Sequence, residues 1–192
     1  PIGGEFAFSP KLIKYLLKQS WTESTRQYGI DIFMSLSAVL GGFKICQSGL
    51  GTKIHKASAP KLGIMFEQVI ETLLTVLVQN KDAWMTGNNG DIFVPDTFGL
   101  KDLAEPQELD INILDLKEKG QTEYSKYQTD IKELLEPYAF SRVHEMFEVE
   151  VFDLTILLWT QIFYSLVYRY DISTSSEDRK KIINSLKPLY FA

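Results

Sequence analysis

Apolar residues recur along this 192-residue chain at steps of three and four positions, the spacing that keeps them on one face of a helix. Polar and charged residues fill the positions between them, as is typical of amphipathic helices that cover a core. The pattern therefore predicts an architecture in which helices predominate. Helices are expected over about Pro10–Gln19, Asp31–Leu40, Leu62–Leu77, Ile111–Leu135, Arg142–Tyr170 and Glu177–Leu186.

Residues that favour helix ends stand beside several of these stretches. Ser9 can cap the first helix, because its hydroxyl can accept a bond from an unpaired backbone N–H of the first turn. Gly41 and Gly42 predict the end of the second helix, since glycine readily takes the left-handed conformation found there. Before the last helix, Thr174 and Ser175 each begin a sequence that fits a capping box.

The remaining patterned segments are short. Glu5–Phe8 predicts a strand, Phe43–Gln47 predicts a buried strand, and Gly49–Ile54 predicts a second extended piece. Met85–Glu108 is rich in Gly, Asn, Asp and Pro and predicts a loop. The expected fold class is therefore α+β, predominantly α, with few short strands.

These elements divide the chain into a small α+β portion, residues 1–61, and a helical C-terminal region, residues 62–192. The first portion holds eight Lys/Arg against three Asp/Glu, whereas the second holds twelve against twenty-two. A basic first portion suits a phosphorylated ligand, although a solvated lysine face on the first helix explains the same charges equally well. The net charge of −5 argues against a nucleic-acid partner, which would need a basic face.

Three observations bear on the compartment. The most apolar segment, Leu154–Tyr168, is about 15 residues long where a membrane-spanning helix needs about 20, so we expect a buried helix there. Cys46 is the chain's one cysteine, which excludes an internal disulfide. Because it lies in the apolar run Phe43–Gln47, we expect a buried, unreactive thiol. The first residues show no basic-then-apolar signal pattern, and the expected location is the cytoplasm.

Two histidines are available for chemistry, which is little material for histidine-based metal cages or hydrolytic triads. His144 falls in the first turn of a predicted helix and is expected to be a surface or capping residue. His55 lies between Lys53 and Lys56 at a predicted strand end. Taken alone, it is either a structural histidine or one ligand of a divalent ion whose other ligands are oxygens.

Three short motifs follow one another over the first 56 residues. They are Gly4-Glu5-Phe6-Ala7, Tyr28-Gly29-Ile30-Asp31-Ile32 and Leu50-Gly51-Thr52-Lys53-Ile54-His55. In this order they resemble the later part of the catalytic domain of GT-A-fold glycosyltransferases. The glucosyl- and mannosyl-3-phosphoglycerate synthases and archaeal proteins related to dolichyl-phosphate mannose synthase are similar. The resemblance implies that residues 1–61 form the acceptor side of such a domain, followed by a helical C-terminal region.

The same resemblance implies roles for individual residues. Asp31 would be the catalytic residue, either as a general base in an inverting reaction or as a sugar-positioning group in a retaining one. His55 would complete a Mg²⁺ or Mn²⁺ site together with the donor diphosphate and an Asp-x-Asp motif, ligands that lie outside this chain. The substrate-binding residues would be Gly3, Gly4, Glu5, Tyr28, Gly29 and Lys53.

The implied activity is hexosyl transfer from a nucleotide sugar of the GDP-mannose or UDP-glucose type. The phosphoglycerate synthases usually have glutamate where this chain has Asp31, so the acceptor stays open between a phosphorylated small molecule and a polyprenyl phosphate. The chain contains no Asp-x-Asp and no glycine-rich phosphate loop, and we therefore expect a fragment that is inactive alone, with its donor-binding half upstream of Pro1.

One alternative from a different class remains. The long apolar helices of residues 62–192 also fit a non-enzymatic helical module for dimerisation or docking, although packing among themselves explains their apolar residues more simply. A homodimer stays open, and so does a peripheral contact with a membrane lipid acceptor.

Overall fold

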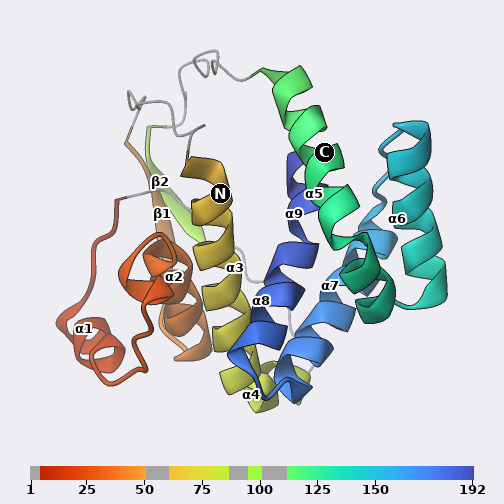
Figure 1. Cartoon of the computed structure of the whole chain (residues 1–192). Coiled ribbons are helices and arrows are strands. Elements are labelled where there is room, and N and C mark those ends of the chain that lie inside the picture. Colours follow the sequence, from red (N-terminus) through yellow and green to blue (C-terminus); the bar gives the residue numbers. More distant parts are fainter. Residues whose placement is uncertain (1–4, 51–60, 87–94, 101–111) are drawn as a thin grey trace. The chain divides into compact units, whose positions relative to one another are not determined.

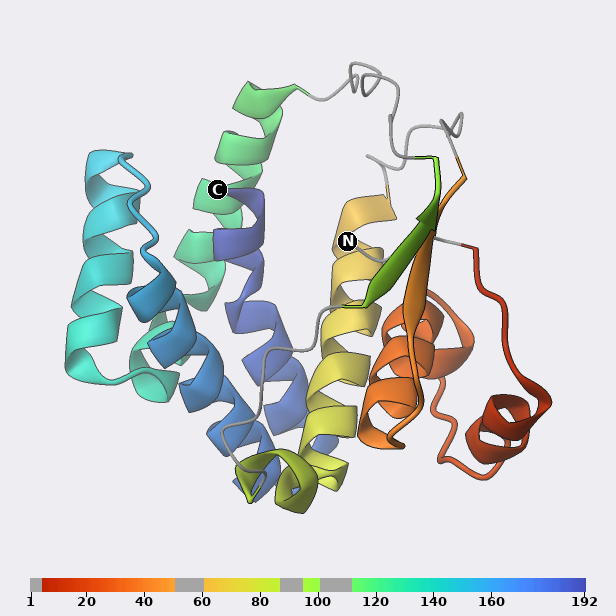
Figure 2. The same ribbon diagram turned by 180° about the vertical axis from the view of Figure 1, so that it is seen from behind.

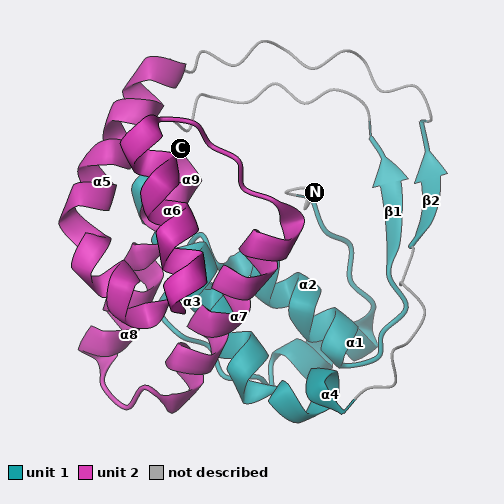
Figure 3. Cartoon of the chain, turned by 90° about the vertical axis from the view of Figure 1, so that its right-hand side faces the viewer, with its two compact units in different colours: residues 1–110 teal, residues 111–192 magenta. Residues whose placement is uncertain are grey.

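The structure is a computed structural model that describes residues 5–50, 61–86, 95–100 and 112–192. The chain forms two compact units, residues 1–110 and residues 111–192 (Figure 3). Helices predominate over a two-stranded sheet, which confirms the expected α+β class with helices in the majority (Figure 1). The division between the units lies at residue 110 rather than at the expected residue 61, because the helix that starts at Leu62 packs within the first unit.

Each unit has its own set of elements. Those of the first unit are α1 (Pro10–Leu16), the 3₁₀ helix η1 (Ser24–Arg26), α2 (Ile30–Leu40), β1 (Cys46–Gly49), α3 (Leu62–Gln79), α4 (Lys81–Met85) and β2 (Asp96–Gly99). Those of the second unit are α5 (Ile113–Leu134), α6 (Pro137–Val149), α7 (Ile156–Ile172), α8 (Ser176–Ser185) and α9 (Lys187–Phe191).

The core of the first unit lies where α1, α2 and α3 meet. Its buried residues are Leu12, Leu16, Phe33, Ala38 and Val76. The indole of Trp21 packs on the ring of Phe33, with centroids 4.7 Å apart, and donates a hydrogen bond of 3.0 Å to the carbonyl oxygen of Leu16. Figures 1 and 2 show α2 and α3 side by side in this unit.

The predicted start of α1 and the predicted end of α2 are confirmed, whereas α1 ends at Leu16, before the expected Gln19. The hydroxyl of Ser9 accepts a bond of 3.2 Å from the N–H of Leu12 at the start of α1. At the end of α2, Gly42 has a φ of 68°, its N–H donates to the carbonyl of Val39, and the N–H of Phe43 donates to the carbonyl of Ala38. These two bonds make a Schellman motif, which pairs carbonyls that the helix end would otherwise leave unbonded.

The two strands pair in parallel, with Cys46 opposite Asp96 and Gly49 opposite Gly99. Both strands are largely exposed, so the expected buried strand at Phe43–Gln47 is wrong, and β1 begins at Cys46. Cys46 is accordingly an exposed free thiol and not a buried one. The predicted strand at Glu5–Phe8 is also wrong, since the segment is irregular and its phenylalanine rings stack at 5.7 Å instead.

The loop expected over Met85–Glu108 contains strand β2. Its four residues gave no strand pattern, because their pairing partner lies fifty positions earlier in the chain. An ion pair of 3.3 Å between Lys44 and Asp96 joins the two segments, but both side chains are mostly exposed and such a pair contributes little to stability. The extended piece expected over Gly49–Ile54 lies largely outside the described residues.

In the second unit, α5 packs against α9, α8 and α6. Gly120 lets α5 and α9 approach closely, because a Cβ there would lie 3.3 Å from the backbone nitrogen of Ala192. The buried apolar side chains of this unit come from all of its helices: Tyr124, Ile131, Leu135, Ala139, Val143, Met146, Phe147, Leu158, Ile162, Leu166, Val167, Tyr170, Ile182, Ile183, Leu186 and Phe191.

The single helix expected over Arg142–Tyr170 is two helices, α6 and α7. Helix α6 ends at Val149 because the next residue, Glu150, has a left-handed φ of 54°, and the chain then runs without regular structure to Thr155. The hydroxyl of Thr155 caps α7 by accepting a bond of 3.2 Å from the N–H of Leu158. The buried helix expected over Leu154–Tyr168 is a helix from Ile156 onward, but α7 is buried on one side only.

The last predicted helix is confirmed as α8. Of the two candidate caps, Ser175 is the one used, and its hydroxyl accepts a bond of 3.0 Å from the N–H of Asp178. Within the part of the chain that the structure describes, α3 is long and apolar enough to cross a membrane, with a mean hydropathy of 1.4. Core helices of soluble proteins pass the same test, so α3 alone does not decide the location of the protein.

Candidate functional site

Three of the predicted acceptor-side residues, Tyr28, Gly29 and Asp31, lie at the start of α2. Asp31 lies in the first turn of this helix and is partly exposed. Its backbone carbonyl accepts a bond of 2.8 Å from the hydroxyl of Ser35. Among the described residues, its carboxylate has no hydrogen-bond or ion-pair partner. The group is therefore available to a hydroxyl or a cation that approaches the start of α2.

The turn before α2 is fixed by bonds to η1 and α3. The backbone N–H of Tyr28 donates to the side-chain oxygen of Gln68 at 3.1 Å, and that of Gly29 donates to the carbonyl of Ser24 at 3.0 Å. The buried hydroxyl of Ser24 donates in turn to the carboxylate of Glu71 on α3. These contacts hold the backbone that carries Asp31 against α3.

Gly29 is needed for packing, whatever else it does. A Cβ at this position would lie 2.0 Å from Oγ1 of Thr72 and 2.7 Å from the carbonyl oxygen of Ser24. Gly29 is buried and its φ of −75° is open to any residue, so close approach to α3 is the reason for a glycine here. This contact explains why position 29 is a glycine, and no bound ligand is needed to explain it.

The other predicted site residues fall into two groups. Glu5 and Tyr28 are exposed and could meet a ligand in solution. Gly3, Gly4, Lys53 and His55 lie outside the described residues, so the structure does not place them relative to Asp31.

A divalent ion was expected near His55. Within the described ranges, no group of three or more His, Cys, Asp or Glu side chains could hold a metal ion. A single carboxylate such as that of Asp31 does not satisfy Mg²⁺ or Mn²⁺, which take about six ligands. The described residues therefore do not fit a metal site by themselves.

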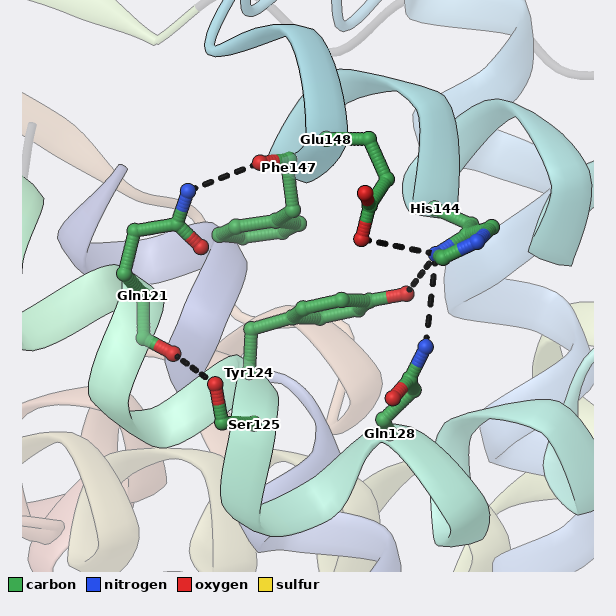
Figure 4. Close-up of polar contacts among 7 residues, drawn as sticks. All are labelled: Gln121, Tyr124, Ser125, Gln128, His144, Phe147 and Glu148. Atoms are coloured by element: carbon green, nitrogen blue, oxygen red, sulfur yellow. Dashed lines mark hydrogen bonds and ion pairs between the residues drawn. The ribbon is translucent and has the colours of Figure 1, made fainter.

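A second polar cluster, which the sequence did not predict, lies between α5 and α6 (Figure 4). The hydroxyl of Tyr124 lies 2.9 Å from Nδ1 of His144, and the side-chain nitrogen of Gln128 lies 3.3 Å from the same atom. The carboxylate of Glu148 is 3.9 Å from it. His144 thus contacts α5 from the middle of α6 rather than from its first turn, so it does not cap the helix. Its side chain is 40% exposed, which agrees with the expected surface position.

Burial of Tyr124 determines the chemistry of this cluster. Burial raises the pKa of its phenol above 10.0, a side-chain hydrogen bond with Gln128 lowers it, and the nearby Glu148 charge raises it. A buried tyrosine hydroxyl needs a hydrogen-bond partner, and His144 provides one. The ring of Tyr124 also stacks on that of Phe147 at 4.2 Å. We interpret the cluster as a packing contact that satisfies a buried hydroxyl.

A recess of about 300 Å³ lies among α5, α7 and α8 in the second unit. Charges of both signs line it: Asp130, Glu133, Arg169, Asp178 and Lys181. At 3.5 Å, the Arg169 guanidinium reaches the backbone carbonyl of Glu133. With three acidic and two basic side chains, the recess has no strong net charge that would select one class of ligand.

Comparisons with known proteins add no relative. No family model, no curated protein and no solved structure matches the chain. The residues at the start of α2 and the motif order that contains them are therefore the observations on which a function can be proposed.

Proposed function

We propose that this chain supplies the acceptor side of a GT-A-fold glycosyltransferase that uses a nucleotide sugar as donor. The observation that carries the proposal is the partly exposed carboxylate of Asp31 in the first turn of α2, held by the Tyr28-Gly29 turn. The motif order of the resemblance supports it, because α2 is followed by the Gly41-Gly42 end and then by strand β1, which leads to Leu50.

The reaction would transfer a hexose from a GDP-mannose or UDP-glucose type of donor to a phosphorylated small molecule or a polyprenyl phosphate. Asp31 would accept the proton of the attacking acceptor hydroxyl in an inverting transfer, or would position a sugar hydroxyl in a retaining one. Its lack of a partner among the described residues suits either role, since a carboxylate already engaged in an ion pair would be a poorer base.

The proposal does not require that the described residues hold the metal. His55 would be one ligand, and the carboxylates of an Asp-x-Asp motif would come from a donor-binding part of a longer protein. The chain on its own would then bind the acceptor weakly and would not turn over the donor.

Binding to this chain is the direct test. Titration with 3-phosphoglycerate, followed by amide chemical shifts, should move the signals of residues 28–33, and Asp31→Asn should weaken the binding. Asp115→Asn is the matched control, because Asp115 also lies in the first turn of a helix and is exposed. A titration in which no signal of α2 moves, with 3-phosphoglycerate or with a short polyprenyl phosphate, would remove the acceptor role.

Turnover is tested in a form of the protein that releases nucleotide from GDP-mannose or UDP-glucose. There, loss of a catalytic base is expected to lower kcat by about 10²–10⁴ for Asp31→Asn. A kcat within a factor of two or so of the parent would show that Asp31 takes no part in the reaction.

A second candidate function is a helical interaction module, and one observation favours it. Helix α7 exposes several large apolar side chains, among them Leu157, Tyr164 and Tyr168. This function is compatible with transferase activity, because it concerns the second unit and Asp31 lies in the first.

A further inference from the structure

Helix α7 is apolar on two opposite faces. One face packs into the core of the second unit through Leu158, Ile162, Leu166 and Tyr170. The other carries Leu157, Gln161, Tyr164 and Tyr168, all exposed; we call these four residues the α7 stripe. At about 100° per residue, the two faces lie about 150° apart around the helix axis. The exposed fractions of Leu157, Tyr164 and Tyr168 are 68%, 56% and 61%, so the stripe is open along three turns.

The stripe carries no charge. From Leu154 to Tyr168 the sequence has no Asp, Glu, Lys or Arg. A nucleic acid or a strongly charged peptide would find no complementary group on it. A second uncharged apolar surface fits, and a copy of the same stripe meets this requirement.

The spacing of the stripe is the same read from either end. Its residues are separated by four, three and four positions, which is the seam of a heptad repeat. When a second α7 runs antiparallel along the first, Leu157 of one copy lies opposite Tyr168 of the other, and Gln161 lies opposite Tyr164. Each contact then occurs twice about a two-fold axis, as an interface between identical subunits requires.

A recess lies at the middle of the stripe. It has a volume of about 200 Å³ and is lined by Gln161, Tyr164 and Ser165 of α7 and by Glu136, Tyr138 and Ala139 at the start of α6. The two-fold axis of an antiparallel pair would pass between Gln161 and Tyr164, beside this recess. A large side chain of the second copy could enter it, in the manner of a knob that fills a hole between facing helices.

We propose that the α7 stripe is a dimer interface, in which a second copy of this chain packs its α7 antiparallel to the first. The amide of Gln161 faces the hydroxyl of Tyr164 of the second copy at the centre of the seam. A polar residue at one seam position fixes the register of such a pair, because any other register leaves its amide buried without a partner. The inference is independent of the proposed transferase activity.

The mass of the chain in solution is the first test. Sedimentation over about a hundredfold range of concentration should show a species of twice the 22.0 kDa of one chain, in equilibrium with the monomer. Leu157→Glu should raise the dimer dissociation constant by about tenfold or more, because the charge would be buried in an apolar seam. Leu114→Glu is the matched control: Leu114 is 69% exposed in the same unit but lies on α5, so the dissociation constant should not change. Circular dichroism shows whether both variants remain folded.

Cross-linking tests the direction of the pair in a Cys46→Ser background, which removes the native thiol. Chains with Leu157→Cys and chains with Tyr168→Cys should form a mixed disulfide when oxidised together, and neither should link to itself efficiently. A parallel pair would instead link Leu157→Cys to itself, because the two copies of position 157 would then lie at the same level. In the antiparallel pair they are eleven residues, or about 16 Å, apart along the axis, which is too far for a disulfide.

Three results would overturn the proposal. One is a monomer at every concentration, and another is a dimer that Leu157→Glu does not weaken. The third is a monomer that floats with vesicles of zwitterionic lipid and loses this binding in Leu157→Glu, which would assign the α7 stripe to a lipid surface.

Discussion

Replacing either of two glycines of the first unit by alanine should change the free energy of unfolding, but in opposite directions. Gly42 has a φ of 68° in the Schellman motif that ends α2, and Gly63 lies in the first turn of α3. A Cβ at either position would meet no atom within 4 Å. Packing is therefore the same in both cases, and backbone conformation alone decides the effect.

We expect Gly42→Ala to lower the free energy of unfolding by about 1 kcal/mol, the approximate cost of a left-handed conformation for a residue with a Cβ. Gly63→Ala should raise it by about 0.5 kcal/mol, since alanine favours a helix and restricts the unfolded chain. Urea unfolding followed by circular dichroism measures both. Equal changes in the two variants would contradict this account of Gly42.

Single residues also show where reasoning from the sequence reaches its limit in the candidate site. The start of α2 could be predicted to within one residue, because its signals lie within a few positions of one another. The contact of Gly29 with Thr72 could not, since the two residues are 43 positions apart and neither side chain indicates the other. Cys46 was predicted to be buried because its neighbours are apolar, but burial of a strand depends on what covers it.

At the scale of elements, the polar contact between α5 and α6 could have been predicted in part from residue spacing in the sequence. Tyr124 and Gln128 lie four positions apart on α5, and His144 and Glu148 lie four positions apart on α6. Residues at this spacing share one face of a helix. Two polar pairs on otherwise apolar faces indicate a polar contact between helices, although the sequence does not say which helix meets which.

This contact predicts a dependence of stability on pH. Because the folded state raises the pKa of Tyr124, the unfolded chain loses the phenol proton first as pH rises, near its ordinary value of 10.0. Below that pH, Tyr124 makes its full contribution to the free energy of unfolding. This contribution is lost as the pH rises through the pKa of the folded state. Urea unfolding from about pH 9 to about pH 11 should show a smaller fall in stability for Tyr124→Phe than for the parent.

Tyr127→Phe on the same helix is the control for this experiment, because it also removes one phenol from α5. At neutral pH, Tyr124→Phe should itself cost about 1 kcal/mol, since His144 loses a hydrogen-bond partner. If the two variants followed the same pH profile, the environment of Tyr124 in the folded state would not differ from that of an ordinary tyrosine.

The helices could be predicted from the sequence better than the strands or the connections. Apolar periodicity located α1, α2, α3, α5 and α8 to within a few residues. It failed at Glu150, because a glutamate in the left-handed conformation is not a helix-ending signal and apolar residues continue through the break. It also failed at β2, whose hydrogen bonds depend on a distant segment.

The whole molecule consists of two units whose cores are built separately. The buried side chains of residues 111–192 come from five helices of the same unit, among them Val143, Leu166 and Leu186. By contrast, Val76 of α3 belongs to the core that α1 and α2 form in the first unit. A boundary at residue 61 would separate α3 from that core.

We therefore expect residues 111–192 to fold alone, with a helical circular dichroism spectrum and a cooperative thermal transition. Residues 62–192 should contain the same transition but should aggregate more readily, because α3 would expose the side chains that pack on α1 and α2, Val76 among them. Comparison of the two fragments by thermal unfolding and light scattering measures this. A fragment of residues 111–192 without a cooperative transition would contradict the division at residue 110.

The parallel pairing of β1 with β2 has a consequence for the order of folding. Its two strands are fifty positions apart and exposed, so little apolar burial offsets the entropy lost when the chain closes that loop. Helices form from near neighbours and need no such closure. The sheet should therefore assemble late, after α2 and α3 have packed and shortened the distance that the two strands must cross.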